Sequence, residues 1–140
     1  MDFAKMKVVY VLVVDKAWAK LYKTGLPPAQ LKLVYHQALF GGNAAGDDAD
    51  EELARGLCRH LRADRLGGKF ERLVMLASGN MLDALRRQYD GNWRDVTVGR
   101  IEDLPARYAD EDVGGYVRHL FARQEAHGGG LAVLPGVMQK

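Results

Sequence analysis

The feature that most constrains the fold is an uninterrupted run of β-branched, aliphatic and aromatic residues near the N-terminus. Residues 7–14 read KVVYVLVV, with no charged residue after the first lysine. A strand that is exposed on one face alternates apolar and polar residues, whereas a strand covered on both faces does not. The run therefore predicts a central strand in an α/β domain, with helices on both faces of its sheet.

Two further strands are expected directly after this run. Asp15 and Lys16 interrupt it with a short polar break, and residues 18–24 then alternate in the way a half-buried strand does. Gly25 and two prolines mark the next turn, and residues 31–38 form the third strand. The first three strands are therefore predicted to form an antiparallel meander.

The rest of the chain alternates helices with short strands. Apolar residues at helical spacing predict three helices, and apolar runs predict two strands between them. The helices are expected over residues 49–65, 80–89 and 110–126, and the strands over 72–77 and 96–101. Right-handed crossovers place the fourth and fifth strands parallel to the first. The prediction is a single three-layer α/β domain with a mixed five-stranded sheet in the order 3-2-1-4-5.

Length and composition agree with one such domain. The 140 residues carry a formal net charge of +2 and contain one cysteine, which excludes an internal disulfide. No apolar run reaches the ~18–20 residues of a membrane span, and the N-terminus lacks a signal-peptide layout, so a cytoplasmic protein without membrane partners is expected. The domain should cover residues 1–127, and a glycine-rich break and an apolar tail occupy residues 128–140.

Several stretches resemble the bacterial host attachment family, proteins described as required for attachment to host cells. The matching stretches are VYVLVVDKAWAKLYKT, the acidic-headed DDADEELARGLCRHL, then GGKFERLVMLASGNMLDALRRQY, and an acid-Leu step at Asp103 and Leu104. Such proteins are similar to the middle domain of the eukaryotic and archaeal class I peptide-chain release factors. The resemblance implies a ribonuclease H-like α/β fold and a role in translation.

The sequence departs from that family pattern in three internal stretches and in the apolar tail after Gly130. The loop after the third strand reads FGGNAAG instead of a polar loop with Arg and Ser. Ala77-Ser78-Gly79 replaces Ala-Pro-Pro, and Leu82 is followed by Asp83 instead of Gly. The implied fold tolerates these changes, whereas a specific activity does not follow from the resemblance.

The glycine segment Gly41-Gly42-Asn43 is the first candidate site. In the release factors a Gly-Gly-Gln loop at the equivalent place positions water against the peptidyl-tRNA ester, so the resemblance implies a loop that faces tRNA. Here Asn43 is one methylene shorter than Gln, and five carboxylates follow closely in residues 47–52 and repel RNA phosphate unless they face away. The alternative interpretation is a flexible structural loop.

An arginine face is the second candidate site. Arg55, Arg59 and Arg62 recur at helical spacing opposite the leucine stripe of the same helix, so all three should share a solvent-exposed face. Guanidinium groups in this arrangement can follow an RNA backbone. The alternative is an ordinary solvated face in which Glu51 and Glu52 pair with Arg55.

No enzyme signature is present in the sequence. Asp15, Glu102 and Asp103 are the acids that a nuclease of this fold could use, but Asp15 falls in a turn, where turn chemistry explains it better. The histidines lack metal-ligand spacing, Cys58 continues an apolar stripe, and Ser78 lacks the flanks of a nucleophile elbow. We expect no metal site and no cofactor.

Three functions remain open. The first is a non-catalytic domain of the host-attachment, release-factor-like kind that binds the ribosome or a tRNA, with no DNA partner. The second is a peptidyl-tRNA ester hydrolase that uses Asn43 and its loop. The third is a protein-binding adaptor that forms homo-oligomers through residues 131–138 or through the exposed edge of the third strand.

Overall fold

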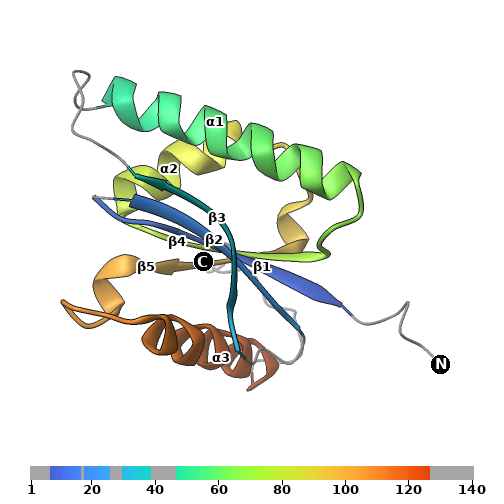
Figure 1. The fold of residues 1–140 in the computed structure, drawn as a ribbon, viewed down its shortest axis with the longest axis vertical. Coiled ribbons are helices and arrows are strands. Elements are labelled where there is room, and N and C mark those ends of the chain that lie inside the picture. The colour runs from blue at the N-terminus through green and yellow to red at the C-terminus, as the bar shows by residue number, and fades with distance from the viewer. Residues whose placement is uncertain (1–6, 17, 26–29, 39–46, 127–140) are drawn as a thin grey trace.

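Five strands form one mixed sheet in the order β3-β2-β1-β4-β5 (Figure 1). The strands are β1 (Val8–Val14), β2 (Trp18–Gly25), β3 (Lys32–Ala38), β4 (Arg72–Ala77) and β5 (Val96–Arg100). β2 is antiparallel to both β1 and β3, and β4 is parallel to both β1 and β5. This computed structural model describes residues 7–16, 18–25, 30–38 and 47–126.

Three helices cover the two faces of the sheet. They are α1 (Asp47–Leu66), α2 (Gly79–Gln88) and α3 (Asp110–Ala126). α1 and α2 lie together on one face, and α3 lies on the other (Figure 1). Strand order, strand direction and helix placement confirm the predicted fold class. Of the described part of the chain, no helix combines the length and apolar character that a membrane crossing requires.

β1 contributes to both hydrophobic cores, which explains why its sequence does not alternate. Tyr10 and Leu12 face α1 and α2, whereas Val11 and Val13 face α3, and each of these side chains is at most 3% exposed. The continuous apolar run is therefore the signature of a central strand between two helical layers.

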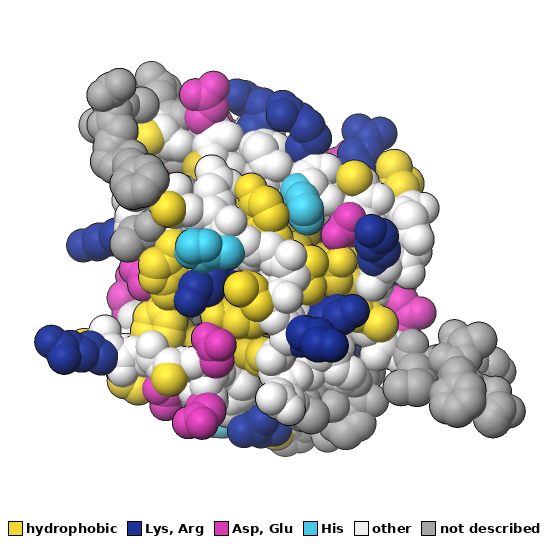
Figure 2. All heavy atoms as spheres, viewed as in Figure 1, with side chains coloured by type: hydrophobic (Ala, Val, Ile, Leu, Met, Phe, Trp, Pro, Cys, Tyr) yellow, Lys and Arg dark blue, Asp and Glu magenta, His cyan; other side chains and the backbone are white. Residues whose placement is uncertain are grey.

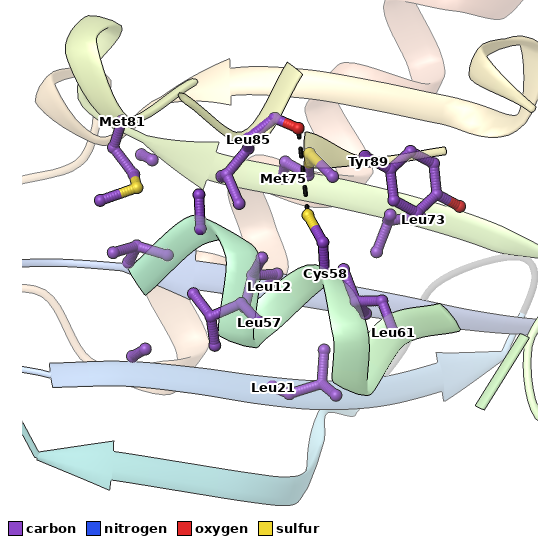
Figure 3. Packing of buried hydrophobic residues seen from close by; sticks show 14 of the residues in the cluster. Leu12, Leu21, Leu57, Cys58, Leu61, Leu73, Met75, Met81, Leu85 and Tyr89 are labelled. Atoms are coloured by element: carbon purple, nitrogen blue, oxygen red, sulfur yellow. Dashed lines mark hydrogen bonds between the residues drawn. The ribbon is translucent and has the colours of Figure 1, made fainter. Parts of the chain in front are cut away.

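The larger core lies between the sheet and the α1–α2 layer. Leu57 and Leu61 of α1 point between Leu12 of β1 and Leu85 of α2 (Figure 3). Cys58 is buried beside them, and its thiol lies 3.9 Å from the carbonyl oxygen of Leu85 (Figure 3). Cys58 is therefore packed as a small apolar residue, as its place in the sequence predicted.

The helix ends follow from local sequence. Gly68 has a φ of +73°, a conformation that a β-carbon disfavours, and it turns the chain after α1. At the start of α2, the Ser78 hydroxyl accepts a hydrogen bond from the backbone N–H of Met81. Residues 127–140 lie outside the described part of the chain, so the domain boundary at residue 127 and the role of the tail stay predictions.

Candidate functional site

Four of the five strands end on the same side of the sheet. We call this side, which lies across the carboxyl ends of those strands, the carboxyl edge. β1, β3, β4 and β5 run in the same direction and all end there, because β3 is antiparallel to β2 and β2 is antiparallel to β1. α1, α2 and α3 follow β3, β4 and β5 in the chain and begin on this side (Figure 1). In open α/β sheets, ligands bind outside the carboxyl ends of the strands, which makes this edge the first place to examine.

The candidate loop Gly41, Gly42 and Asn43 lies outside the described residues. The structure places only its two anchors, the end of β3 at Ala38 and the start of α1 at Asp47. Both anchors are at the carboxyl edge, as the strand order requires. The loop's contact with tRNA and the ester hydrolase that depends on Asn43 therefore stay predictions.

The acids at the carboxyl edge accept hydrogen bonds from tyrosines. The Tyr108 hydroxyl donates to Asp15 Oδ2 at 2.6 Å, and the Tyr116 hydroxyl donates to Asp103 Oδ2 at 2.7 Å. Burial, followed by the hydrogen bond to Asp103, raises the pKa of Tyr116 to about 12, and the corresponding causes raise the pKa of Tyr108 further. Both phenols are therefore neutral donors at physiological pH.

Asp15 also closes the first hairpin, as predicted from its position. Its backbone N–H donates to the carbonyl oxygen of Trp18 at 2.8 Å, and the Trp18 ring packs edge-on against Tyr108 with centroids 5.8 Å apart. Within the described residues, no three side chains of His, Cys, Asp or Glu converge as metal ligands would. The carboxylates of this edge thus hold the hairpin and the α3 layer together.

Arg100 lies across the start of α2, an arrangement that the sequence analysis missed. A β-carbon at Gly79 would come within 2.9 Å of the Arg100 Nη1, so only glycine lets the guanidinium approach this closely. The carboxyl end of β5 is therefore in contact with the first residue of α2. The sequence signal was the Ser78-Gly79 pair, where a cap is followed by a residue without a side chain.

The three arginines of the predicted face are all exposed on α1. At 100° per residue, Arg55, Arg59 and Arg62 lie within an arc of about 60°. Arg62 is 3.7 Å from Asp90, which also accepts a 2.9 Å hydrogen bond from Arg65. No carboxylate of the described residues lies within 4.0 Å of Arg55 or Arg59. The face therefore presents two guanidinium groups without an ion-pair partner in the described chain.

Glu51 and Arg55, paired in the alternative interpretation, form no ion pair within 4.0 Å, although the charge of Arg55 is among the causes that lower the pKa of Glu51. Glu51 instead binds α2, with Oε1 2.8 Å from the Arg87 Nη2 and Oε2 2.6 Å from the Gln88 Nε2. The hydrogen bond from Arg87 is the largest cause that lowers the pKa of Glu51. Arg87 and Gln88 together bind both carboxylate oxygens of Glu51. Hydrogen bonds to both oxygens are stronger than a single (i, i+4) ion pair on an exposed helix face, so the contact between the helices is preferred to the local one.

An aromatic side chain lies close to Arg86 of α2, although the sequence showed no pattern of aromatic residues among the arginines. The Arg86 guanidinium lies 5.9 Å from the centroid of the half-buried Trp93 ring, and Trp93 packs edge-on against Tyr89. The turn after α2 folds back and places Trp93 beside the last turn of that helix. We call the surface formed by Arg55, Arg59 and Arg62 of α1 the arginine face. Trp93 belongs to the α1–α2 layer, which also contains this face.

The face drawn in Figure 2 shows how the charges are distributed. Lys and Arg side chains gather along α1, and acidic side chains lie between basic groups elsewhere on this face. Hydrophobic side chains are exposed over β3, where Leu33 is 51% and Val34 is 40% exposed. The molecule thus presents the exposed arginines of α1 beside an apolar edge strand, β3.

The remaining titratable candidates have structural contacts. The His60 ring packs against Tyr35 with centroids 4.7 Å apart, and its Nε2 is 3.5 Å from Asp64. Burial is the main cause that raises the pKa of the Cys58 thiol to about 12. Neither residue combines accessibility with an activating partner.

Comparison with known proteins shows distant structural similarities. No protein-family model and no curated protein sequence matches the chain. The chain is similar to Archaeoglobus fulgidus Pelota, at 11% identity and a TM-score of 0.47 over 86% of this chain and 37% of that one. The archaeal translation termination factor aRF1 gives 10% identity and a TM-score of 0.47 over 86% and 38%.

A third similar structure is that of T. thermophilus RuvC, described in complex with a Holliday junction substrate. It gives 10% identity and a TM-score of 0.49 over 88% of this chain and 97% of that one. The chain spans less than two fifths of the length of Pelota and aRF1. At these identities and TM-scores the similarities assign no activity, and the fold class follows from the strand order alone.

Proposed function

We propose that this chain is a non-catalytic RNA-binding domain of the host-attachment, release-factor-like kind, and that the ribosome or a tRNA is its partner. The observation that carries the proposal is the exposure of Arg55 and Arg59 on one side of α1, without a carboxylate of the described chain within ion-pair distance. Exposed guanidinium groups that form no ion pair within the described chain are available to phosphate oxygens.

The neighbouring helix supports the same interpretation. The Glu51 carboxylate is bound by Arg87 and Gln88 of α2, and it forms no ion pair with Arg55 within 4.0 Å. Trp93, half-buried beside Arg86, adds an aromatic ring of the kind on which unpaired bases stack. The α1–α2 layer therefore combines exposed guanidinium groups with an aromatic side chain, as RNA-binding surfaces do.

Salt-dependent binding tests this proposal. The wild-type chain, the double variant Arg55→Ala/Arg59→Ala and the control Arg118→Ala are titrated with tRNA and with ribosomes at several salt concentrations. Arg118 is an exposed arginine of α3, on the opposite face of the sheet. Removal of one guanidinium that binds a phosphate should reduce the slope of log K against log salt by about one.

The expected result is a reduced slope and weaker binding for the double variant, with wild-type behaviour for Arg118→Ala. Equal weakening in both variants would mean that net charge alone drives the binding. Wild-type affinity in the double variant, or a wild-type chain that binds neither tRNA nor ribosomes, would refute the proposal.

A second candidate function is protein binding through β3. β3 is the outermost strand of the sheet next to β2, and its Leu33 and Val34 are among the large apolar side chains that remain exposed. Such an edge is a template for another strand. The β3–β2 register shifts between Leu21 and Tyr22, and a local irregularity of this kind restricts how a further strand can pair.

Sedimentation of Leu33→Lys and Val34→Lys separates this candidate from RNA binding. If the protein forms homo-oligomers through β3, the mass of the assembly should decrease in both variants, and the affinity for tRNA should not change. An unchanged mass in both variants removes the β3 edge as the site of self-association.

A further inference from the structure

A basic hollow lies at the end of the sheet opposite to the carboxyl edge. It has a volume of about 470 Å³ and lies where β1 begins, β2 ends and β3 begins. Lys7, Lys23 and Lys32 line it together with Gln30, and Val8 and Leu31 supply apolar surface. We call it the lysine hollow, and no carboxylate is among the described residues that line it.

Two of these lysines face one another across neighbouring strands. Lys23 of β2 and Lys32 of β3 are direct partners in the antiparallel register. Side chains at directly opposed positions lie close together, and like charges there destabilise a sheet. The three lysines are exposed, and none has a carboxylate within 4.0 Å in the described part of the chain. The described residues supply no carboxylate to the hollow, and an anionic ligand would offset its positive charge.

We propose that the lysine hollow binds a ligand with two or more adjacent phosphoryl groups, either an inorganic oligophosphate or the phosphate chain of a nucleotide. Ammonium groups are effective point charges for phosphate oxygens, and three of them match the charge of adjacent phosphoryl groups better than that of a single monoanion. The volume lies within the range of small-molecule sites. Val8 and Leu31 offer the apolar surface that a nucleoside would contact.

Calorimetric titration of the full chain with tripolyphosphate, ATP and adenosine tests the proposal. Wild type should bind tripolyphosphate and ATP in a saturable manner, and binding should weaken with salt. Lys23→Gln and Lys32→Gln should each weaken binding about tenfold, because each removes one charged hydrogen-bond donor. If ATP binds more tightly than tripolyphosphate, the hollow also recognises the nucleoside. If the two bind equally, it recognises the phosphate groups alone.

Lys16→Gln is the matched control, because Lys16 is an exposed lysine at the opposite end of β1. It removes the same charge and should leave the affinity unchanged. A thermal scan adds an independent readout. Without ligand, Lys23→Gln should melt about 1–3 °C above wild type, because it removes the facing like charge. With tripolyphosphate, wild type should gain more thermal stability than the variant.

Three results would overturn the proposal. They are the absence of saturable tripolyphosphate binding by wild type, an affinity in Lys23→Gln and Lys32→Gln that equals that of Lys16→Gln, and binding of RNA at the hollow without binding of either phosphate ligand. Because the arginine face is on α1, its variants should not change oligophosphate affinity, so this proposal and the proposed RNA binding can fail separately.

Discussion

Gly99 on β5 is a buried position at which a single added methyl group should destabilise the fold. Gly99 is buried, and a β-carbon there would lie 2.9 Å from Leu76 Cδ2 and 2.9 Å from both Cε2 and the hydroxyl oxygen of Tyr116. Leu76 is 0% exposed and belongs to the core between the sheet and α3. The Tyr116 ring is planar, and Asp103 holds its hydroxyl. Both neighbours therefore resist displacement.

We expect Gly99→Ala to destabilise the fold by about 1–3 kcal/mol, the usual cost of overpacking a core. For a chain of this length that corresponds to a melting temperature lower by roughly 3–10 °C. Gly56→Ala is the matched control. Gly56 is exposed within α1, and a β-carbon there would meet nothing within 4 Å. The gain in helix propensity should stabilise this control by about 0.5–1 kcal/mol.

Urea unfolding followed by circular dichroism measures both changes. The midpoint should decrease for Gly99→Ala and increase for Gly56→Ala, with the same dependence on urea as in the wild type. If Tyr116 moves away to accommodate the methyl group, its hydrogen bond to Asp103 breaks and its pKa should fall from about 12 toward the ordinary value. A Gly99→Ala protein as stable as wild type would show that the β5–α3 contact is looser than described.

Buried groups support three further predictions. Burial and a neighbouring carboxylate raise the pKa values of Tyr10 and Tyr116 to about 12, from 10.0 in an unfolded chain. The stability that these groups contribute is complete below pH 10 and should be lost as the pH rises toward 12, which a pH series of unfolding curves measures. The Cys58 thiol, with a pKa raised to about 12, should react with an aromatic disulfide reagent only after unfolding. Leu61→Ala should cost about 2–5 kcal/mol in denaturant unfolding, because Leu61 is 1% exposed and packs in the α1–α2 core.

The fold could be predicted because its signals are local. The unbroken apolar run of β1, the turn residues after it and the 3.6-residue period of α3 each depend on neighbours in the sequence. The helix and strand limits in the structure lie within two residues of the expected ones. The strand order then follows from chain connectivity and from the handedness of crossovers.

The contacts at the candidate sites could not be predicted, because they join residues that are far apart in the chain. Tyr108 and Asp15 are separated by 93 positions, and Arg87 and Glu51 by 36. The sequence pattern favoured Arg55, four residues away, as the partner of Glu51. In the structure, the packing of α1 on α2 brings Arg87 and Gln88 into hydrogen bonds with Glu51. The facing of Lys23 and Lys32 depends on the pairing register of β2 with β3, which a shift between Leu21 and Tyr22 alters.

The tyrosine–aspartate pairs place acidic residues on the α3 side of the carboxyl edge. Tyr108 and Tyr116 both pack in the core under α3, and their hydrogen bonds draw Asp15 and Asp103 to that side of the carboxyl edge. The first turn of α3 adds further acids there, and the Tyr22 hydroxyl donates to Asp110.

The α1–α2 side adds guanidinium groups to the acids with which α1 begins. The arginine face lies on α1, and the Arg100 guanidinium rests on the first residue of α2. Both α1 and α3 begin at the carboxyl edge with acidic residues, at positions 47–52 and 110–112, and both helices carry more acids than arginines. An RNA should therefore reach the arginine face from the later turns of α1 and not from the carboxyl edge. Arg118 is a matched control because it is an exposed arginine of an equally acidic helix on the opposite face of the sheet.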